Sequence, residues 1–340
     1  MSKPDILSFL NDEFLMPQPE VLEHSTKRES LFIGIPKECA FQEKRVPLVP
    51  EAVALLVSNG HKVYVESNSG ISSSFTDQEY SEAGAKICLN VKEVYEADII
   101  LKVEPPSLQE LDYFKHNQCL ISALQLKTQK AKYFKKLMDK KVTAVAFDYI
   151  KDEAQVFPIV RSMGEIAGTS SILIAAELLS TFSGGRGLLM GGIPGVKPTR
   201  VVIIGAGTVA EYAARSAVSL GALVSVFDNS VARLRRMQSD LNFPIATSIM
   251  QPKVLEKALK RADVAIGALR AKEGRTPCVI SDDMVQKMKP KSVIVDVSID
   301  QGGCFETSEL TTHESPTFIK HDVIHYCVPN IASRVAKTAS

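Results

Sequence analysis

The stretch 201–210 contains glycines whose spacing could hold a pyrophosphate. An apolar run ends at Gly205, which permits a tight turn, and Gly207 would let the backbone approach a phosphate closely. Ala210 is small enough for a following helix to pack against the preceding strand. The N-terminus of that helix would offer unpaired N–H groups and a partial positive charge. The spacing predicts a dinucleotide site, whereas the glycines alone would also fit a structural turn.

An acidic residue follows at the distance that such a site requires. Asp228 closes the next apolar run, 23 positions after Gly205. A carboxylate there accepts hydrogen bonds from the adenosine ribose hydroxyls and repels a 2′-phosphate. Arg233, one helical turn further on, is the cation that could accept such a phosphate instead. The pattern predicts NAD as the cofactor in preference to NADP.

Strands and helices must position these residues, and the chain alternates between the two from residue 31 onwards. Apolar runs typical of strands are separated by stretches with helical spacing, which predicts largely parallel sheets. The predicted strands are 31–35, 62–66, 98–102, 118–124, 142–147, 200–204, 223–227, 263–267 and 292–297. A helical pattern at 163–182 and a glycine-dense segment at 184–195 divide them into two groups. We expect an α/β fold of two doubly wound, Rossmann-like domains that face each other across a cleft.

The two groups of predicted strands correspond to two expected domains with different functions. Residues 1–30 are polar without a clear period and are expected to form an extension. We expect a substrate domain at 31–160 and an NAD-binding domain at 161–332. The segment 333–340 is typical of the start of a helix and is expected to complete the substrate domain. No glycine or proline closes that helix, so an incomplete C-terminal end stays open.

Composition limits the classes of partner. Lys plus Arg number 40 and Asp plus Glu number 39, so no net field would attract nucleic acid or an anionic membrane. Six scattered cysteines without a CxxC pair favour reduced thiols and predict no metal site. No stretch is typical of a signal peptide or a membrane-spanning helix. We therefore expect a cytoplasmic protein that binds small molecules.

Several segments together resemble one family, the alanine dehydrogenases and the related NAD-binding subunit of proton-translocating transhydrogenase. The resemblance covers about 31–340 and rests on GIPKE at 34–38, EKRVPLVP at 43–50, ILKV at 100–103, GGRGLLMGG at 184–192, IGAGT at 204–208 and VDVSIDQGG at 295–303. Within this pair, DQGGCFE at 300–306 and YCVPN at 326–330 favour alanine dehydrogenase. The resemblance implies a homo-oligomeric, NAD-dependent enzyme that interconverts L-alanine and pyruvate plus ammonium.

The resemblance assigns Arg45 and Lys102 to the 2-oxo or 2-amino acid substrate. A guanidinium can hold both oxygens of a carboxylate, and an ammonium can polarise a carbonyl or imine as hydride arrives. Arg45 follows the first predicted strand, and Lys102 ends an apolar one. Without the resemblance, a solvated arginine beside Glu43 and Lys44 and a solvated strand end would explain both residues.

Proton transfer is the uncertain step. The resemblance implies a histidine as acid and base at the position where this chain has Gln125, and glutamine does not exchange a proton near neutral pH. It also implies a catalytic carboxylate at Asp300, beside the nicotinamide. If turnover persists, the proton must pass through Asp300, Lys102 or water. His325 is a minor alternative.

The resemblance adds two further assignments. Asn330 is similar to a family residue that contacts nicotinamide and substrate, and Met163 to one that lines the substrate pocket. The predicted cofactor contacts are Gly205, Gly207, Thr208, Val209, Asp228, Gly267, Asp300 and Asn330. Most of the candidate residues follow the carboxyl ends of predicted strands, where open α/β sheets bind ligands.

Three other functions stay open. A transhydrogenase-type subunit that works against an NADP-binding partner is the first, because its relatives also lack the histidine. An NAD-binding protein without turnover is the second, and a lysine-forming oxidoreductase on the same plan is the third. The sequence leaves the amino acid used, the reaction direction and the assembly undetermined.

Overall fold

The computed structural model describes residues 30–126, 129–241, 243–271 and 274–340. Apart from Ser30, the extension expected at 1–30 lies outside these residues. Two β-sheets follow each other along the described chain, and both are largely parallel. The predicted α/β class with two Rossmann-like sheets is confirmed.

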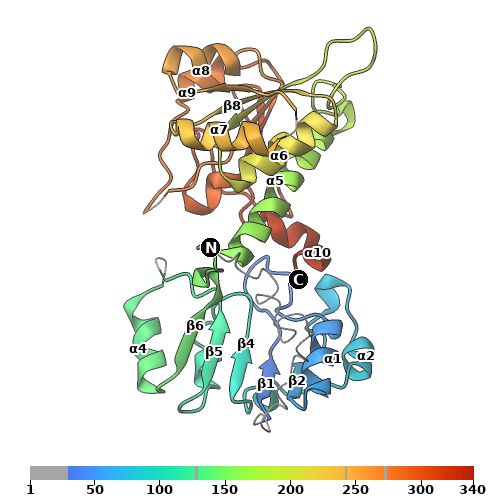
Figure 1. Ribbon diagram of the computed structural model, residues 1–340, viewed down its shortest axis with the longest axis vertical. Helices are drawn as coiled ribbons and strands as arrows, with labels where there is room; N and C mark the ends of the chain where they lie inside the picture. The colour runs from blue at the N-terminus through green and yellow to red at the C-terminus, as the bar shows by residue number, and fades with distance from the viewer. Residues whose placement is uncertain (1–29, 127–128, 242, 272–273) are drawn as a thin grey trace, which may run out of the picture. The chain divides into compact units, whose positions relative to one another are not determined.

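The first sheet is entirely parallel and has the order β3-β2-β1-β4-β5-β6 (Figure 1). Its strands are β1 (Phe32–Ile35), β2 (Lys62–Glu66), β3 (Lys86–Cys88), β4 (Ile99–Leu101), β5 (Cys119–Ser122) and β6 (Thr143–Ala146). The chain builds outward from β1 in one direction and then from β4 in the other. At such a reversal the loops after the two strands diverge, which leaves room for a ligand at their carboxyl ends.

The second sheet has the order β12-β13-β11-β10-β7-β8-β9, and only the β12–β13 pair is antiparallel. Its strands are β7 (Arg200–Ile204), β8 (Leu223–Phe227), β9 (Ala246–Ser248), β10 (Val264–Gly267), β11 (Val293–Asp296), β12 (Thr317–Lys320) and β13 (Val323–Tyr326). Its reversal lies between β7 and β10, where Ile204 pairs with Gly267. The two sheets therefore each offer one ligand-binding edge.

The sequence pattern missed four strands. β3 and β9 have three residues each, which is too short to show a period of two. β12 and β13 form an antiparallel pair that extends the second sheet beyond its βα units. The nine strands expected from the sequence are all present.

Helices connect the strands in both halves. Those of the first half are α1 (Pro50–Ser58), α2 (Asp77–Glu82), α3 (Val91–Val94) and α4 (Ala131–Asp139). The others are α5 (Pro158–Leu178), α6 (Thr208–Ser219), α7 (Val231–Asp240), α8 (Pro252–Leu259), α9 (Asp282–Gln286) and α10 (Ala336–Ala339). Short 3₁₀ helices include η3 (Ile71–Ser73), η7 (Val297–Gln301) and η8 (Ile331–Val335). None of the helices in the described ranges is both long and apolar enough to cross a lipid bilayer.

Helix α5 starts earlier than its pattern predicts, at Pro158 instead of residue 163. Proline suits the first helical position because its missing N–H would have no partner there. The helix packs closely on α6, since a Cβ at Gly168 would lie 2.3 Å from the carbonyl oxygen of Val209. α5 therefore supports the first turn of the helix that follows the glycine turn.

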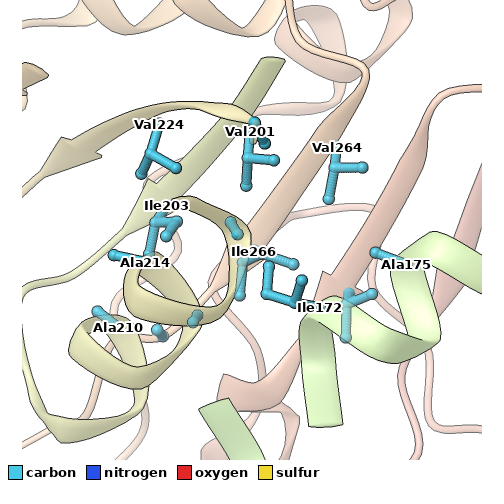
Figure 2. Close-up of a cluster of buried hydrophobic side chains, with 14 of the residues drawn as sticks. Ile172, Ala175, Val201, Ile203, Ala210, Ala214, Val224, Val264 and Ile266 are labelled. Carbon is cyan, nitrogen blue, oxygen red and sulfur yellow. The ribbon is translucent and has the colours of Figure 1, made fainter. Parts of the chain in front are cut away.

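The core of the second half explains why its strands are apolar on both faces. Figure 2 shows Val201 and Ile203 of β7 beside Ile266 of β10, with α5 and α6 packed over them. The alternate residues of β7, Val202 and Ile204, belong to a second cluster on the other face of the sheet. Parallel strands covered on both faces read as continuous apolar runs, as these do.

The C-terminal residues contact loops of the first half. Ser340 Oγ accepts a 2.9 Å hydrogen bond from the backbone N–H of Val46 and lies 3.1 Å from Ser73 Oγ. Ser333 Oγ accepts from the N–H of Lys44 at 2.9 Å and donates to the carbonyl of Gln42 at 2.8 Å. The loop between β1 and α1 is thus hydrogen-bonded to residues almost 300 positions later.

Candidate functional site

The glycine turn has the backbone that its sequence predicts. β7 ends at Ile204 and α6 begins at Thr208. Gly205 has φ of 114°, and a Cβ there would lie 2.5 Å from the carbonyl oxygen of Ala268. At Gly207 a Cβ would meet no atom within 4 Å. The first glycine is required by the fold, whereas the second leaves space in front of the N-terminus of α6.

Asp228 lies beside this turn and is 5% exposed. Its Oδ2 accepts a 2.8 Å hydrogen bond from the N–H of Ala206, and its Oδ1 accepts one of 2.7 Å from Ser230. The guanidinium of Arg233 lies 3.8 Å from Oδ2. Each carboxylate oxygen has a second lone pair that a ribose hydroxyl could use. The Asp228 carboxylate is thus held in place by a backbone N–H of the glycine turn.

One cavity of about 300 Å³ brings together several residues that the sequence assigned to the site. The predicted residues that line it are Arg45, Met163, Val209, Asp300 and Asn330. A second cavity of about 650 Å³ is lined by the predicted residues Gln125, Gly207 and Thr208. Arg270 and Gln301 line both cavities, so the two are adjacent.

Arg45 is held by a glutamate that the sequence interpretation treated only as a neighbour. Glu43 accepts from Arg45 Nε at 2.8 Å and from Nη2 at 2.6 Å, and its side chain is fully buried. The Nη1 group of Arg45 points to the sulfur of Met163, 3.1 Å away. Burial opposes ionisation of Glu43, but the hydrogen bonds and charge of Arg45 outweigh it and keep the Glu43 pKa below its ordinary value. The pair fixes the plane of the guanidinium.

Asn330 and Asp300 complete this side of the cavity. Asn330 Nδ2 donates to Glu43 Oε2 at 2.9 Å, and the Asn330 backbone N–H donates to Asp300 Oδ1 at 3.0 Å. Asp300 is partly exposed to solvent, but protein atoms surround most of its carboxyl group. This partial burial raises the pKa of Asp300, against the opposing effects of the Asn330 N–H and Arg45.

Lys102 lies among carboxylates and lines neither cavity. Its side chain is 1% exposed, with Nζ 2.8 Å from Glu110 Oε1 and 3.2 Å from Glu38 Oε2. Burial disfavours the ammonium, but the two carboxylates outweigh it and raise the pKa of Lys102. Its assignment to the substrate stays a prediction, and its observed partners are two glutamates.

Gln125 contacts a further carboxylate that the sequence interpretation did not select. Its Nε2 donates to Glu104 Oε2, and Glu104 Oε1 lies 3.9 Å from Arg45 Nη2. Burial and the negative charge of Glu43 raise the pKa of Glu104 to about 7. The only signal in the sequence was its position two residues after Lys102, directly beyond a strand end.

Gly267, Asp296 and His325 pack within the second half of the chain, and the cofactor contact expected at Gly267 stays a prediction. A Cβ at Gly267 would lie 2.4 Å from Asp296 Oδ1. Asp296 Oδ2 accepts from Ser308 Oγ at 2.7 Å. His325 is buried in β13, bonds Thr307 at 2.8 Å and has a pKa lowered by burial to about 4. His325 lines neither of these two cavities.

The two doubly wound sheets, with a glycine turn at one reversal and a paired arginine near the other, define a dinucleotide-binding α/β protein. The family models for the N-terminal and C-terminal domains of alanine dehydrogenase/PNT match residues 34–167 and 171–340. The chain belongs to this family.

Individual relatives agree with the family assignment. An alanine dehydrogenase of Methanococcus maripaludis is 41% identical over 312 residues, which cover 91% of this chain and 83% of the relative. A solved L-alanine dehydrogenase is 38% identical with a TM-score of 0.85, covering 90% of this chain and 85% of that one. A solved transhydrogenase from Sinorhizobium meliloti is 26% identical with a TM-score of 0.81, covering 91% and 89%.

Proposed function

We propose that this protein is an NAD-dependent alanine dehydrogenase that catalyses the reversible oxidative deamination of L-alanine to pyruvate and ammonium. The observation that carries the proposal is the cavity that unites Arg45, Met163, Asp300 and Asn330 with Val209 at the start of α6. A small 2-oxo acid held there would lie next to a nicotinamide presented by the glycine turn. Relatives named alanine dehydrogenase across most of the chain support the same activity.

The residues of the turn fit NAD. Gly205 adopts a backbone that a side chain would obstruct, and Gly207 leaves space for a pyrophosphate at the N-terminus of α6. Asp228 is placed to accept from the ribose hydroxyls. When bound, NAD supplies the acceptor for the hydride that leaves the substrate Cα.

The remaining residues would bind and orient the amino acid. Glu43 holds the Arg45 guanidinium so that Nη1 faces the cavity, where it can bind the substrate carboxylate. Asp300 offers a carboxyl group of raised pKa beside the same space and could position the amino group. We assign the substrate to residues 31–160 with 333–340, and the cofactor to 161–332, within a homo-oligomer.

A transhydrogenase-type NAD(H)-binding subunit is the second candidate. It is favoured by Gln125, because a hydride exchange between two dinucleotides needs no acid–base residue at that position. The likeness to the Sinorhizobium meliloti transhydrogenase supports the same fold for both functions.

The deciding experiment follows NADH oxidation by absorbance with pyruvate and ammonium, beside a reaction without ammonium. We expect ammonium-dependent turnover in the parent and at least an equal rate in Gln125→His. A protein that binds NADH by fluorescence titration but shows no turnover with either variant is not an alanine dehydrogenase. NADH-dependent reduction of an NADP analogue only with an added partner would support the second candidate.

A further inference from the structure

One carboxyl group of the site lines neither cavity but contacts a lining residue of each. Glu104 lies just beyond β4 with its side chain 19% exposed. It accepts a hydrogen bond from Gln125, which lines the larger cavity. Its other oxygen faces Arg45, which lines the smaller one. This location is where a group exchanging protons with a substrate bound to Arg45 would have to be.

We propose that Glu104 is the proton-exchanging group of this active site, with Gln125 as the residue that positions it. This inference rests on the proposed alanine dehydrogenase activity and names the acid and base for it. A glutamine amide donates to a carboxylate but does not take its proton, so it can orient Glu104 without competing for the proton. The histidine of the family would then be replaced by two residues: Glu104 exchanges the proton, and Gln125 orients Glu104.

The charges around Glu104 suit this role. Glu43 and Glu38 disfavour its ionised form, while Arg45 and Lys102 favour it, and burial is the largest effect. The resulting pKa of about 7 lets the carboxyl both accept and donate a proton near neutral pH. Glu110, by contrast, has a pKa held below its ordinary value despite burial, because Lys102 binds it. Of these two carboxyl groups beyond β4, only that of Glu104 is present in both its protonated and its ionised form near neutral pH.

The proton steps can be written completely. Ionised Glu104 first accepts a proton from the alanine ammonium and passes it to solvent, which lets hydride leave Cα for NAD and leaves a protonated imine. Water then adds to the carbon of this imine, a C–O bond forms, and a water proton passes to the Glu104 carboxylate. Glu104 returns this proton to the nitrogen, the C–N bond breaks, and ammonia leaves with the bonding pair. The hydroxyl proton then passes to Glu104 and on to ammonia, which gives pyruvate, ammonium and ionised Glu104. Reductive amination runs these steps backwards: it starts from ionised Glu104 and ammonium, and it ends when protonated Glu104 gives a proton taken from solvent to the amine of the new alanine.

The pH dependence follows from these protonation states. Alanine oxidation needs ionised Glu104, so kcat should rise as pH increases through about 7. Pyruvate amination needs the protonated form at its last step, where Glu104 protonates the new amine, so its rate should fall over the same interval. These opposite limbs are the signature to measure.

The test compares the parent, Glu104→Gln, Gln125→His and the double variant from pH 6 to 9 in both directions. We expect Glu104→Gln to lower kcat by about 10²–10⁴-fold, to lose the limb near neutral pH and to keep the Kd for NADH. In the double variant, histidine should restore at least about tenfold of the lost rate, since one well-placed acid–base group contributes about 10²-fold or more. Glu96→Gln is the matched control, because its 62% exposed side chain carries the same charge at the other end of β4.

Other results overturn the assignment. Glu104→Gln with kcat within about twofold of the parent and the same pH limbs excludes proton exchange by Glu104, because loss of an acid–base group costs far more. A fall in kcat that histidine does not restore, together with weaker NADH binding, indicates a structural role instead.

A parent without turnover would refute the proposed function, and the inference would then be decided by binding. Pyruvate bound near Arg45 adds a negative charge beside Glu104, so binding near neutral pH should take up protons. Calorimetry of pyruvate binding in two buffers of different ionisation enthalpy should detect this uptake in the NADH-loaded parent and not in Glu104→Gln. Equal uptake in both proteins rejects Glu104.

Discussion

The edges at the two strand-order reversals use different chemistry. Beyond β1 and β4, charged side chains crowd together, with Lys102 between Glu38 and Glu110 and Arg45 bound to Glu43. Beyond β7 and β10 the essential groups are glycines and backbone N–H groups, with one carboxylate bonded to two amides. In the proposed function, the first edge would bind a ligand through side-chain charge, and the second through the shape of its backbone.

The difference determines what holds each edge together. A buried ion pair loses most of its value when one partner is removed, because the other charge stays buried without compensation. A glycine turn fails when a side chain fills its space or strains its backbone. The first edge should therefore be sensitive to charge removal and the second to added atoms.

Removing Lys102 should have the largest effect. Lys102→Met leaves Glu38 and Glu110 without their shared cation, so we expect the free energy of unfolding to fall by about 3–5 kcal/mol in urea denaturation. Lys86→Met is the control, because Lys86 and its partner Glu93 are about half exposed. That exposed pair is screened by water and should contribute far less to stability. Equal effects of both variants would contradict the comparison.

Adding one methyl group to the glycine turn should separate folding from binding. Gly205→Ala places its Cβ against the carbonyl of Ala268 at a φ of 114° and should cost at least about 1–3 kcal/mol of stability. Gly207→Ala should fold with a change under about 1 kcal/mol, since its Cβ meets open space. Its Kd for NADH should nevertheless rise about tenfold, or about 1.4 kcal/mol. An unchanged Kd for NADH in Gly207→Ala, measured by fluorescence titration, would contradict the placement of the pyrophosphate at Gly207.

The charge of Asp228 should have the smallest effect, on cofactor choice. Asp228→Asn keeps an oxygen for the Ala206 N–H but removes the charge that repels a 2′-phosphate and releases Arg233. We expect the ratio of NADPH to NADH affinity to rise about tenfold, or about 1.4 kcal/mol. Asp240→Asn, at the exposed end of α7, is the control. The same cofactor preference in both variants would reject the ribose contact.

The second edge was readable from the sequence and the first was only partly so. Gly205, Gly207 and Asp228 lie at fixed spacing along one βαβ unit, so local pattern alone brings them together. Arg45 was found through its motif, yet its partner Glu43 also accepts a hydrogen bond from Asn330, and no short-range pattern contains that contact between residues 43 and 330.

Pairing between loops explains the residues that the sequence did not identify. Glu104 and Gln125 come from loops after neighbouring strands, and only the order β4-β5 makes them adjacent. The sequence pattern correctly placed Lys102 at a strand end. Its two glutamate partners lie before and after it in the chain, and their separation from Lys102 matches neither a helix nor a strand period. The three-residue strands β3 and β9 were missed for the simpler reason of length.

The hydrogen bonds of Ser333 and Ser340 to the loop that carries Glu43 and Arg45 have a consequence for synthesis of the chain. The partners Val46 and Ser340 are 294 positions apart. At about 5–20 residues per second, a ribosome needs about 15–60 s between them. The first sheet can form during that time, but the arginine loop gains these anchors only once the last of these residues has emerged. A nascent chain would therefore acquire its first sheet well before the loop that carries Arg45 is anchored.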